Sequence, residues 1–342
     1  MAKVPSSGIC IDRQDWLGHV NPRADDRRTW FPVGDSGQHI PVRALINSWK
    51  PAMAALARVW HAGGQLVIIN DHSNRLDMME NVDGIYAEMG DMDPEGMAHA
   101  VGSGLAGMNL PVWIWNHDKP AATLTRDYLA RGLGGHLLAG VFPTVPVKNN
   151  DHAIGGDCAP NCSYDGAFVD YGAMFVALRG RRWVLAARAA QVAPAAAGGP
   201  PVALANAFST TAAWIAPGGS AAVYLSAVVF APRLGRVSVT LRGVDAVLGC
   251  SLAPNPGALK AVVVQPGDML DAAGRAVPGS FPRGSCGAAA VAGRNDARGC
   301  AAITSVAEGA GADSVVVTLQ FGGSLDVSGP FTNAALVALR CA

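Results

Sequence analysis

Residues Gln65–Gly90 read QLVIINDHSNRLDMMENVDGIYAEMG. Two short apolar runs, Leu66–Ile69 and Gly84–Tyr86, lie in this stretch, and polar residues follow each of them. An apolar run of about four residues rich in Ile and Val is typical of a strand buried on both faces of a parallel sheet. A parallel α/β barrel carries its catalytic groups at the C-terminal ends of such strands. The stretch therefore predicts two parallel strands with candidate catalytic residues at their ends. Any one of these polar residues could equally cap a helix or lie in a loop.

The composition narrows the class of protein. The chain has 342 residues, of which 50% are hydrophobic and 15% are charged, so it can bury the core of one large or two ordinary domains. Its formal net charge is zero, which gives no electrostatic case for binding nucleic acid or an anionic membrane. We also expect no membrane span, since no apolar run reaches about 18 residues. No signal peptide is visible, and the compartment and the oligomeric state stay open.

The seven cysteines do not form a recognisable metal site. Only Cys158 and Cys162 are close in sequence, and this spacing favours a local disulfide in an oxidising compartment over zinc. Glycine-rich dinucleotide, P-loop and GxSxG motifs are missing from the sequence. We therefore expect neither a resident metal nor a cofactor.

The two halves of the chain differ in character. All eight histidines lie at or before His152, whereas the chain after about residue 190 is dominated by Ala, Val, Gly, Pro and Ser. The composition predicts a catalytic-type domain at residues 1–192, a linker at 193–201 and an all-β sandwich at 202–342. The strands expected in the sandwich are Ala221–Phe230, Arg236–Val244, Leu259–Val264, Ser314–Phe321 and Ala335–Arg340.

The first half alternates between strand and helix patterns, which is typical of a parallel α/β sheet. The expected strands are Ser7–Ile11, Leu66–Ile69, Gly84–Tyr86, Pro111–Trp115 and Gly140–Phe142. The expected helices include Val42–Ala62, Glu95–Met108 and Thr125–Leu138, and a long loop is expected at Gly18–Ile40. Five strands correspond to a partial or truncated (β/α)8 barrel, since a closed barrel needs eight. The alternatives are a fragment of a barrel and an open sheet.

Polar and aromatic residues gather at the expected strand ends. Carboxylates, amides and imidazoles can hydrogen-bond sugar hydroxyls, and an aromatic ring can stack on the apolar face of a sugar. The candidates for substrate binding are Asp15, Trp16, Asn70, Asp71, His72, Asp91, Trp115, Asn116, Asp151 and His152.

Several motifs in the same order resemble a known group of proteins. They are IDRQDW, VIINDHSNRLD, VDGIYAEMG, PVWIWN and GVFPTVPVKNNDH, followed by DYGAMFVALRGRRWVL. Together they resemble the C-terminal half of the barrel in an uncharacterised group of glycoside hydrolases, similar to the α-galactosidase-like retaining enzymes and followed by a β-sandwich. The resemblance covers roughly Gly8 to Val192.

The resemblance implies a nucleophile at the end of the fourth barrel strand and an acid/base carboxylate at the end of the sixth. On that register Asp12 is the expected nucleophile and Glu88 the expected acid/base. The related enzymes mostly carry Asp at the second position, so Asp91 competes with Glu88. Retaining cleavage needs one carboxylate that stays ionised and one carboxylic acid that donates a proton.

Three functions follow as expectations. The first is retaining hydrolysis of an O-glycosidic bond in an unknown carbohydrate. The second is a non-catalytic carbohydrate-binding protein or degenerate glycosidase fragment, in which strands needed for activity are missing. The third is a metal-dependent hydrolase that uses the pairs Asp71-His72 and Asp151-His152 as ligands.

Overall fold

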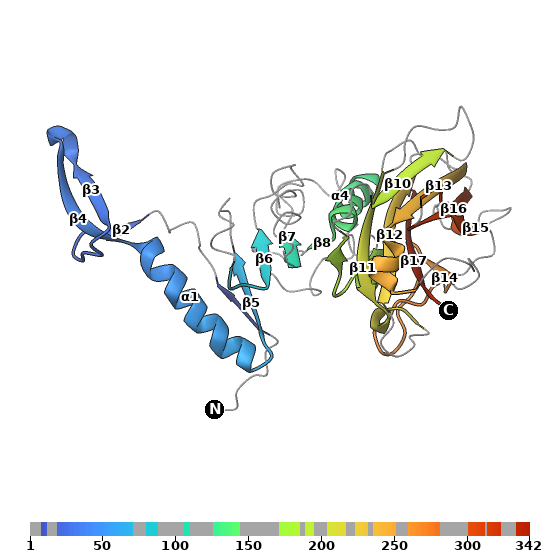
Figure 1. Cartoon of the computed structure of the whole chain (residues 1–342), viewed down its shortest axis with the longest axis horizontal. Helices are drawn as coiled ribbons and strands as arrows, with labels where there is room; N and C mark the ends of the chain where they lie inside the picture. Colours follow the sequence, from blue (N-terminus) through green and yellow to red (C-terminus); the bar gives the residue numbers. More distant parts are fainter. Residues whose placement is uncertain are drawn as a thin grey trace. The chain divides into compact units, whose positions relative to one another are not determined.

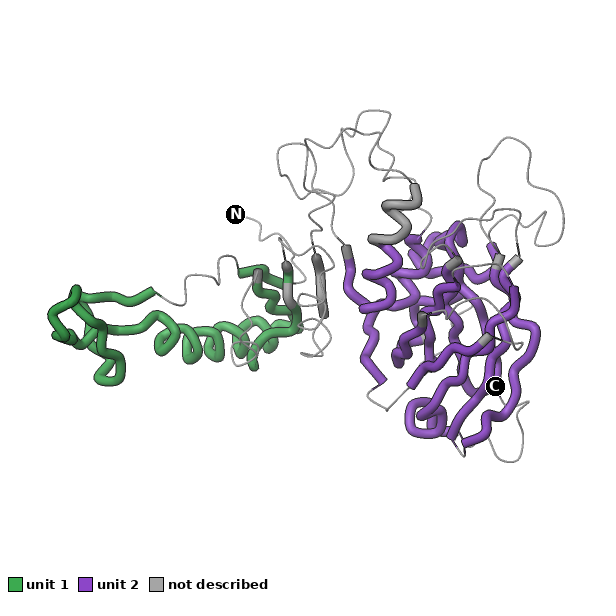
Figure 2. The backbone as a smooth tube through the Cα atoms, turned by 90° about the horizontal axis from the view of Figure 1, so that it is seen from above, with its two compact units in different colours: residues 1–115, 143–154 green, residues 116–142, 155–342 purple. Residues whose placement is uncertain are grey.

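The computed structural model describes residues 8–11, 19–70, 80–87, 106–109, 126–143, 171–184, 189–194, 204–216, 223–231, 235–250, 259–280, 300–311, 313–322 and 333–342. The chain divides into two compact units (Figure 2). Unit 1 comprises Met1–Trp115 with Pro143–Ile154, and unit 2 comprises Asn116–Phe142 with Gly155–Ala342. The predicted division at residues 193–201 stays a prediction.

Unit 1 contains a parallel sheet built from short apolar strands (Figure 1). Its strands are β1 (Gly8–Ile11), β5 (Leu66–Asn70), β6 (Gly84–Ala87) and β7 (Ala106–Asn109). A further strand, β8 (Val141–Pro143), lies where the sequence predicts one at Gly140–Phe142, and its first two residues belong to unit 2. β5 pairs in parallel with β1 on one side and with β6 on the other, and β6 pairs in parallel with β7. The strands predicted at Leu66–Ile69 and Gly84–Tyr86 are confirmed.

Helix α1 (Leu45–Ala62) covers one face of this sheet. Met53 and Ala57 are buried against Val67, Ile69 and Val82. The spacing of its apolar residues follows the helical period, which is why the sequence predicts this helix correctly. The helix ends at a Gly-Gly pair, where Gly64 adopts φ +69° and donates its N–H to the carbonyl of His61.

The expected loop at Gly18–Ile40 is wrong, because these residues form most of a small antiparallel sheet. It contains β2 (Val20–Asn21), β3 (Thr29–Val33) and β4 (Gln38–Ala44) in the order β2-β4-β3. A single turn of 3-10 helix, Gly34–Ser36, joins β3 to β4. The prolines of β3 and β4 conceal the strand pattern, since proline in an apolar run argues against a strand.

Two further expectations of the barrel need correction. The helix predicted at Glu95–Met108 is wrong at its end, because Ala106–Asn109 is strand β7; its earlier part lies outside the described residues, as does the strand predicted at Pro111–Trp115. In the part of the chain that the structure describes, the parallel strands form no closed barrel. The fold is a mixed one, with most strands in several sheets and few helices.

Unit 2 contains two antiparallel sheets. One has the order β10-β13-β16-β15, made of Ala190–Pro194, Gly235–Arg242, Ser314–Gly322 and Cys300–Glu308. The other has the order β14-β17-β12-β11-β9, made of Leu259–Val264, Asn333–Cys341, Val223–Ala231, Leu204–Thr211 and Arg182–Trp183. The described strands within them all pair antiparallel, so the antiparallel character predicted for this part of the chain is confirmed.

The two sheets of unit 2 share one hydrophobic core. Alternate residues of β13, such as Val237 and Val239, are buried in the same cluster as Leu225 of β12 and Val337 of β17. β12 is also buried on its other face, where α4 (Arg126–Ala139) contacts β11 and β12. Asn206 of β11 donates its amide hydrogen to the carbonyl oxygen of Leu138 over 2.7 Å. Unit 2 therefore has a helical layer over one sheet of a two-sheet core.

A disulfide joins the last strand of unit 2 to the residues that follow a short helix. Cys250, which follows the short helix α6 (Val244–Leu248), is bonded to Cys341 at the end of β17, 91 residues further along the chain. A long closed loop restricts the unfolded chain strongly, and a stabilisation of about 2–5 kcal/mol is typical. The bond also suits an oxidising compartment.

We expect the double substitution of Cys250 and Cys341 by Ser to lower the free energy of unfolding of unit 2 by about 2–5 kcal/mol. Urea unfolding with matched m-values measures the difference. The control is Cys10→Ser, since Cys10 lies outside this disulfide. Equal stability of the double variant and the unaltered protein would show that the bond contributes nothing.

Candidate functional site

The carboxyl ends of β1, β5 and β6 lie beside one another. Ile11 at the end of β1 is the partner of Ile69 in β5, and Ile69 is the partner of Ile85 in β6. Parallel strands are spaced by about 4.8 Å, so the ends of β1 and β6, which flank β5, are about 10 Å apart. This edge of the sheet is the one where the sequence predicts a site.

Asn70 is the one predicted site residue within the described part of the chain. It is the last residue of β5, and its backbone lies beside Tyr86 of β6. The other predicted residues lie outside the described residues: Asp12, Asp15, Trp16, Asp71, His72, Glu88, Asp91, Trp115, Asn116, Asp151 and His152. Asp12 and Glu88 come directly after Ile11 and Ala87, the last residues of β1 and β6.

The opposite edge of the sheet is held by a carboxylate with a structural role. Asp83, one residue before β6, accepts hydrogen bonds from the backbone N–H of Val67 and interacts with the imidazole of His61, each over 2.8 Å. The Asp83 N–H also donates to the Val67 carbonyl. These bonds tie the C-terminal turn of α1 to the starts of β5 and β6. Asp83 therefore aligns the strands from the edge that faces away from the predicted site.

A second carboxylate, Asp26, fixes the β2–β4 sheet to the start of α1. Its Oδ2 accepts from the side-chain amide of Asn47 (2.7 Å), from the Ala44 N–H (3.0 Å) and from the Thr29 hydroxyl (2.9 Å). Its Oδ1 accepts from the backbone N–H groups of Arg28 and Thr29. The hydrogen bond from Asn47, followed by those of the backbone and of Thr29, holds the pKa of Asp26 far below its usual range. A carboxylate at this position also opposes the positive end of the α1 dipole.

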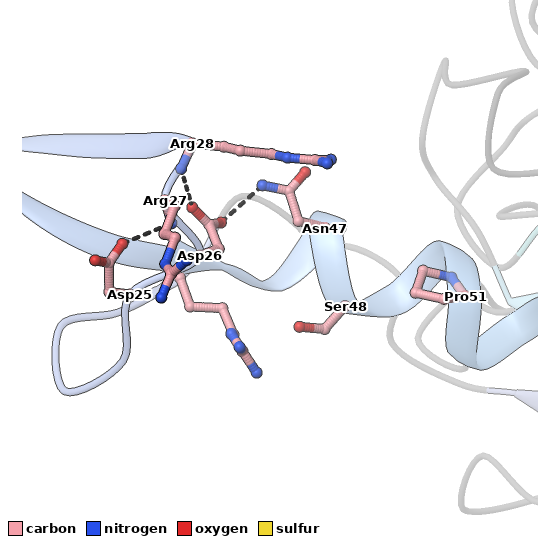
Figure 3. A pocket seen from close by; sticks show the side chains of 8 residues that line it. Asp25, Asp26, Arg27, Arg28, Asn47, Ser48 and Pro51 are labelled. Carbon is pink, nitrogen blue, oxygen red and sulfur yellow. Dashed lines mark hydrogen bonds between the residues drawn. The ribbon is translucent and has the colours of Figure 1, made fainter.

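Next to Asp26 lies an open hollow of about 560 Å³ (Figure 3). It is lined by Asp25, Asp26, Arg27, Arg28, Arg43, Asn47, Ser48 and Pro51. Sequence reasoning missed this site because it treats the region as a loop. The cluster of arginines between residues 23 and 43 is the signal that could have found it.

Unit 2 contains a half-buried arginine without a polar partner. The Nε and Nη2 atoms of Arg181 have no hydrogen-bond partner, and burial lowers its pKa to about 10. The guanidinium lies over the ring of Phe142, 5.5 Å from its centroid. Gly140 leaves room for this side chain, since a Cβ there would lie 2.7 Å from Cδ of Arg181 and 2.8 Å from the ring of Phe208. The arginine is thus accommodated by packing, and its charge is poorly compensated.

The described residues include neither a group of metal ligands nor a helix that could span a membrane. No group of three or more His, Cys, Asp and Glu side chains in that part of the chain could hold a metal ion, and the pairs Asp71-His72 and Asp151-His152 lie outside it. Within the same residues, every helix is too short or too polar to cross a bilayer.

Comparisons of the chain with protein-family models, with curated proteins and with solved structures gave no match.

We expect Asp26→Ala to lower the melting temperature at pH 7. The folded-state pKa of Asp26 is depressed, so its carboxylate stabilises the fold above the unfolded pKa of about 3.9 and loses this effect as the pH falls. The gap between the variant and the unaltered protein should therefore narrow below about pH 4. Thermal melts between pH 3 and pH 7 measure it, and a gap that is constant with pH would contradict the role given to the charge.

We expect Arg181→Met to stabilise unit 2 by about 1 kcal/mol or more, because it removes a buried charge without a partner and keeps an apolar stem on Phe142. Urea unfolding measures the change. Arg236→Met is the control, since Arg236 is exposed on β13. A loss of stability in Arg181→Met would show that the cation–π contact outweighs the burial of the charge.

Proposed function

We propose that the chain is a retaining glycoside hydrolase that acts on an O-glycosidic bond. The observation that carries the proposal is the strand order β1-β5-β6 with parallel pairing. An acidic residue follows β1 and another follows β6 in the sequence, so the two come from strands separated by one neighbour. This is the arrangement that the resemblance implies for the fourth and sixth strands of a barrel. On this proposal β1, β5, β6 and β7 belong to a (β/α)8-type architecture followed by a β-sandwich.

The spacing of the strands suits the chemistry. Two strand intervals place the backbones at the ends of β1 and β6 about 10 Å apart. Side chains of Asp and Glu that lean toward each other across β5 can shorten this separation to the 5–5.5 Å of a retaining pair. A Glu on the sixth strand, where the related enzymes mostly have Asp, reaches further by one methylene.

The roles differ between the two carboxyl groups. Asp12 attacks the anomeric carbon, and the bond from that carbon to the leaving oxygen breaks as the glycosyl–enzyme ester forms. Glu88 gives its proton to the leaving oxygen and then removes a proton from the water that hydrolyses the ester. Asn70 is the last residue of the strand between them, and on this proposal it binds a hydroxyl of the sugar.

A second candidate, a carbohydrate-binding protein without hydrolytic activity, is favoured by the open sheet that the described strands form. A parallel sheet of few strands leaves backbone groups unpaired at its edges, and a barrel site takes residues from several strands. In this case the aromatic and polar residues at the strand ends hold a sugar, and no bond is cleaved. The two candidates differ in one measurable property, which is turnover.

We expect Asp12→Asn to abolish turnover of every aryl glycoside that the unaltered protein cleaves, by about 10⁴-fold or more, because no covalent intermediate can form. Glu88→Gln should lower kcat by about 10²–10⁴-fold on substrates with poor leaving groups. Its effect should shrink for a dinitrophenyl glycoside, whose leaving oxygen needs no proton. Initial rates on a panel of nitrophenyl glycosides measure both effects.

The matched control is Asp35→Asn, because Asp35 lies in the exposed turn between β3 and β4. It should retain full activity, and all three variants should melt at the temperature of the unaltered protein. If Asp12→Asn keeps more than a tenth of the activity, the assignment of the nucleophile fails. If the unaltered protein cleaves nothing but binds a glycan, the second candidate replaces the first.

A further inference from the structure

The hollow beside α1 is rich in guanidinium groups. Of its lining residues, Arg27, Arg28 and Arg43 are cationic and Asp25 and Asp26 are anionic, so the lining carries one formal positive charge. Figure 3 shows the side chain of Arg28 extending from the turn toward Asn47 at the start of α1. Asn47 and Ser48 provide uncharged polar groups at the same place.

The two carboxylates are already used within the fold. Asp26 accepts five hydrogen bonds at the junction between α1 and the hairpin that β3 and β4 form, and Asp25 accepts one from the backbone N–H of Arg27 over 2.6 Å. The guanidinium groups of Arg27, Arg28 and Arg43 make no ion pair or hydrogen bond with any residue that the structure describes. The hollow therefore offers free donors and few free acceptors, which suits an anionic ligand.

The backbone at Arg27 is unusual. Among the described residues, it alone has a positive φ without being glycine, with a value of 59°. An L-residue with a side chain pays free energy for this left-handed conformation, and glycine would adopt it without strain. No residue among those that the structure describes bonds to the guanidinium that this backbone displays. A strained residue whose side chain has no structural partner points to a functional use of that side chain.

An exposed aromatic ring lies on the same face of the hairpin. Trp30 is paired with Pro41 across β3 and β4, and Arg43 is two residues further along β4, so all three point to one face. The side chain of Trp30 is 60% exposed. An exposed indole on the face of the hairpin that carries Arg43 can stack on the apolar face of a sugar ring while an arginine holds its acidic substituent.

The hollow lies at the start of α1, beyond the part of the helix that packs on the sheet. The fully buried residues of α1 begin at Met53, and of its earlier residues Trp49 is partly buried against the core. Asn47, Ser48 and Pro51 of the first turns line the hollow. These turns and the hairpin of β3 and β4 extend away from the parallel strands (Figure 1).

We infer that this hollow is a subsite for a carboxylate-bearing sugar, namely a uronic acid residue of an acidic polysaccharide. The arginines bind the carboxylate through paired N–H donors, and Trp30 stacks on a sugar ring of the chain. The zero net charge of the whole protein argues against a nucleic acid, which needs an extended basic surface. The inference rests on the proposed function for its choice of carbohydrate, and it names the substrate class.

Calorimetry of the full-length chain tests the subsite with three probes. They are an oligogalacturonate, the same oligomer with its carboxylates reduced to alcohols, and inorganic phosphate. We expect that, of the three probes, only the oligogalacturonate binds. Its affinity should fall when the salt concentration rises from 50 to 200 mM. Equal binding of the reduced oligomer would overturn the role of the carboxylate. Binding of phosphate as tight as that of the oligomer would overturn the sugar and leave a general anion site.

Variants place the binding at the hollow. Arg27→Gly removes the guanidinium and relieves the backbone, so it should weaken binding at least 10-fold while the melting temperature stays equal or rises. Arg43→Gln and Trp30→Ala should each weaken it by a similar factor. Arg58→Gln, which alters an exposed arginine of α1 outside the hollow, is the control and should bind normally. Normal binding by Arg27→Gly and Arg43→Gln would overturn the inference.

These outcomes are independent of catalysis. If oligogalacturonate binds and is not cleaved, the subsite stands and the proposed hydrolysis fails. If neutral glycosides are cleaved and the acidic oligomer is not bound, the hydrolysis stands and the subsite fails.

Discussion

The parallel pairing of β1, β5 and β6 is the constraint on which the rest of unit 1 depends. α1 buries its apolar stripe against Val67 and Ile69 of β5 and against Ile9 and Ile11 of β1, and the parallel register sets these residues side by side. The same register places the carboxyl ends of the strands side by side. Asp83 secures the other ends by accepting the Val67 N–H and contacting His61. Burial on one face and alignment at one edge thus leave the opposite edge available for polar chemistry.

In the described part of the junction between the hairpin and α1, the charge of Asp26 has a structural role and the charges of the neighbouring arginines have none. Asp26 is saturated by hydrogen bonds, and its low pKa keeps it ionised wherever the protein is folded near neutral pH. The arginines around it have no such partners in the described structure. A fold that needed this charge only for stability would pair it within the chain. The contrast between one fully bonded acid and three free guanidinium groups is what makes the hollow a candidate for binding.

The sequence allowed prediction of elements whose pattern is strong and unbroken. These elements are the helix at Leu45–Ala62 and the strands at Leu66–Asn70 and Gly84–Ala87. Their apolar residues follow the pattern of a buried element, and glycines mark where the elements begin or end. The strands at Ala190–Pro194, Leu204–Thr211 and Cys300–Glu308 were missed, because Ala, Ser and Thr carry little hydrophobic signal and the strands are defined by tertiary pairing. The pair Cys250–Cys341 joins residues 91 apart, and spacing gives no indication of such a bond. Of the predicted site, Asn70 alone falls among the described residues, so the site remains a prediction from strand ends and resemblance.

A crystal structure that resolves Asp12 and Glu88 would test the central claim most directly, through the distance between their carboxyl carbons. The strand order β1-β5-β6 and a retaining mechanism predict about 5–5.5 Å, with both groups on the face of the sheet opposite α1. A separation near 6.5–9.5 Å would keep hydrolysis but imply inversion. A separation beyond about 10 Å, or side chains on opposite faces of the sheet, would contradict a catalytic pair.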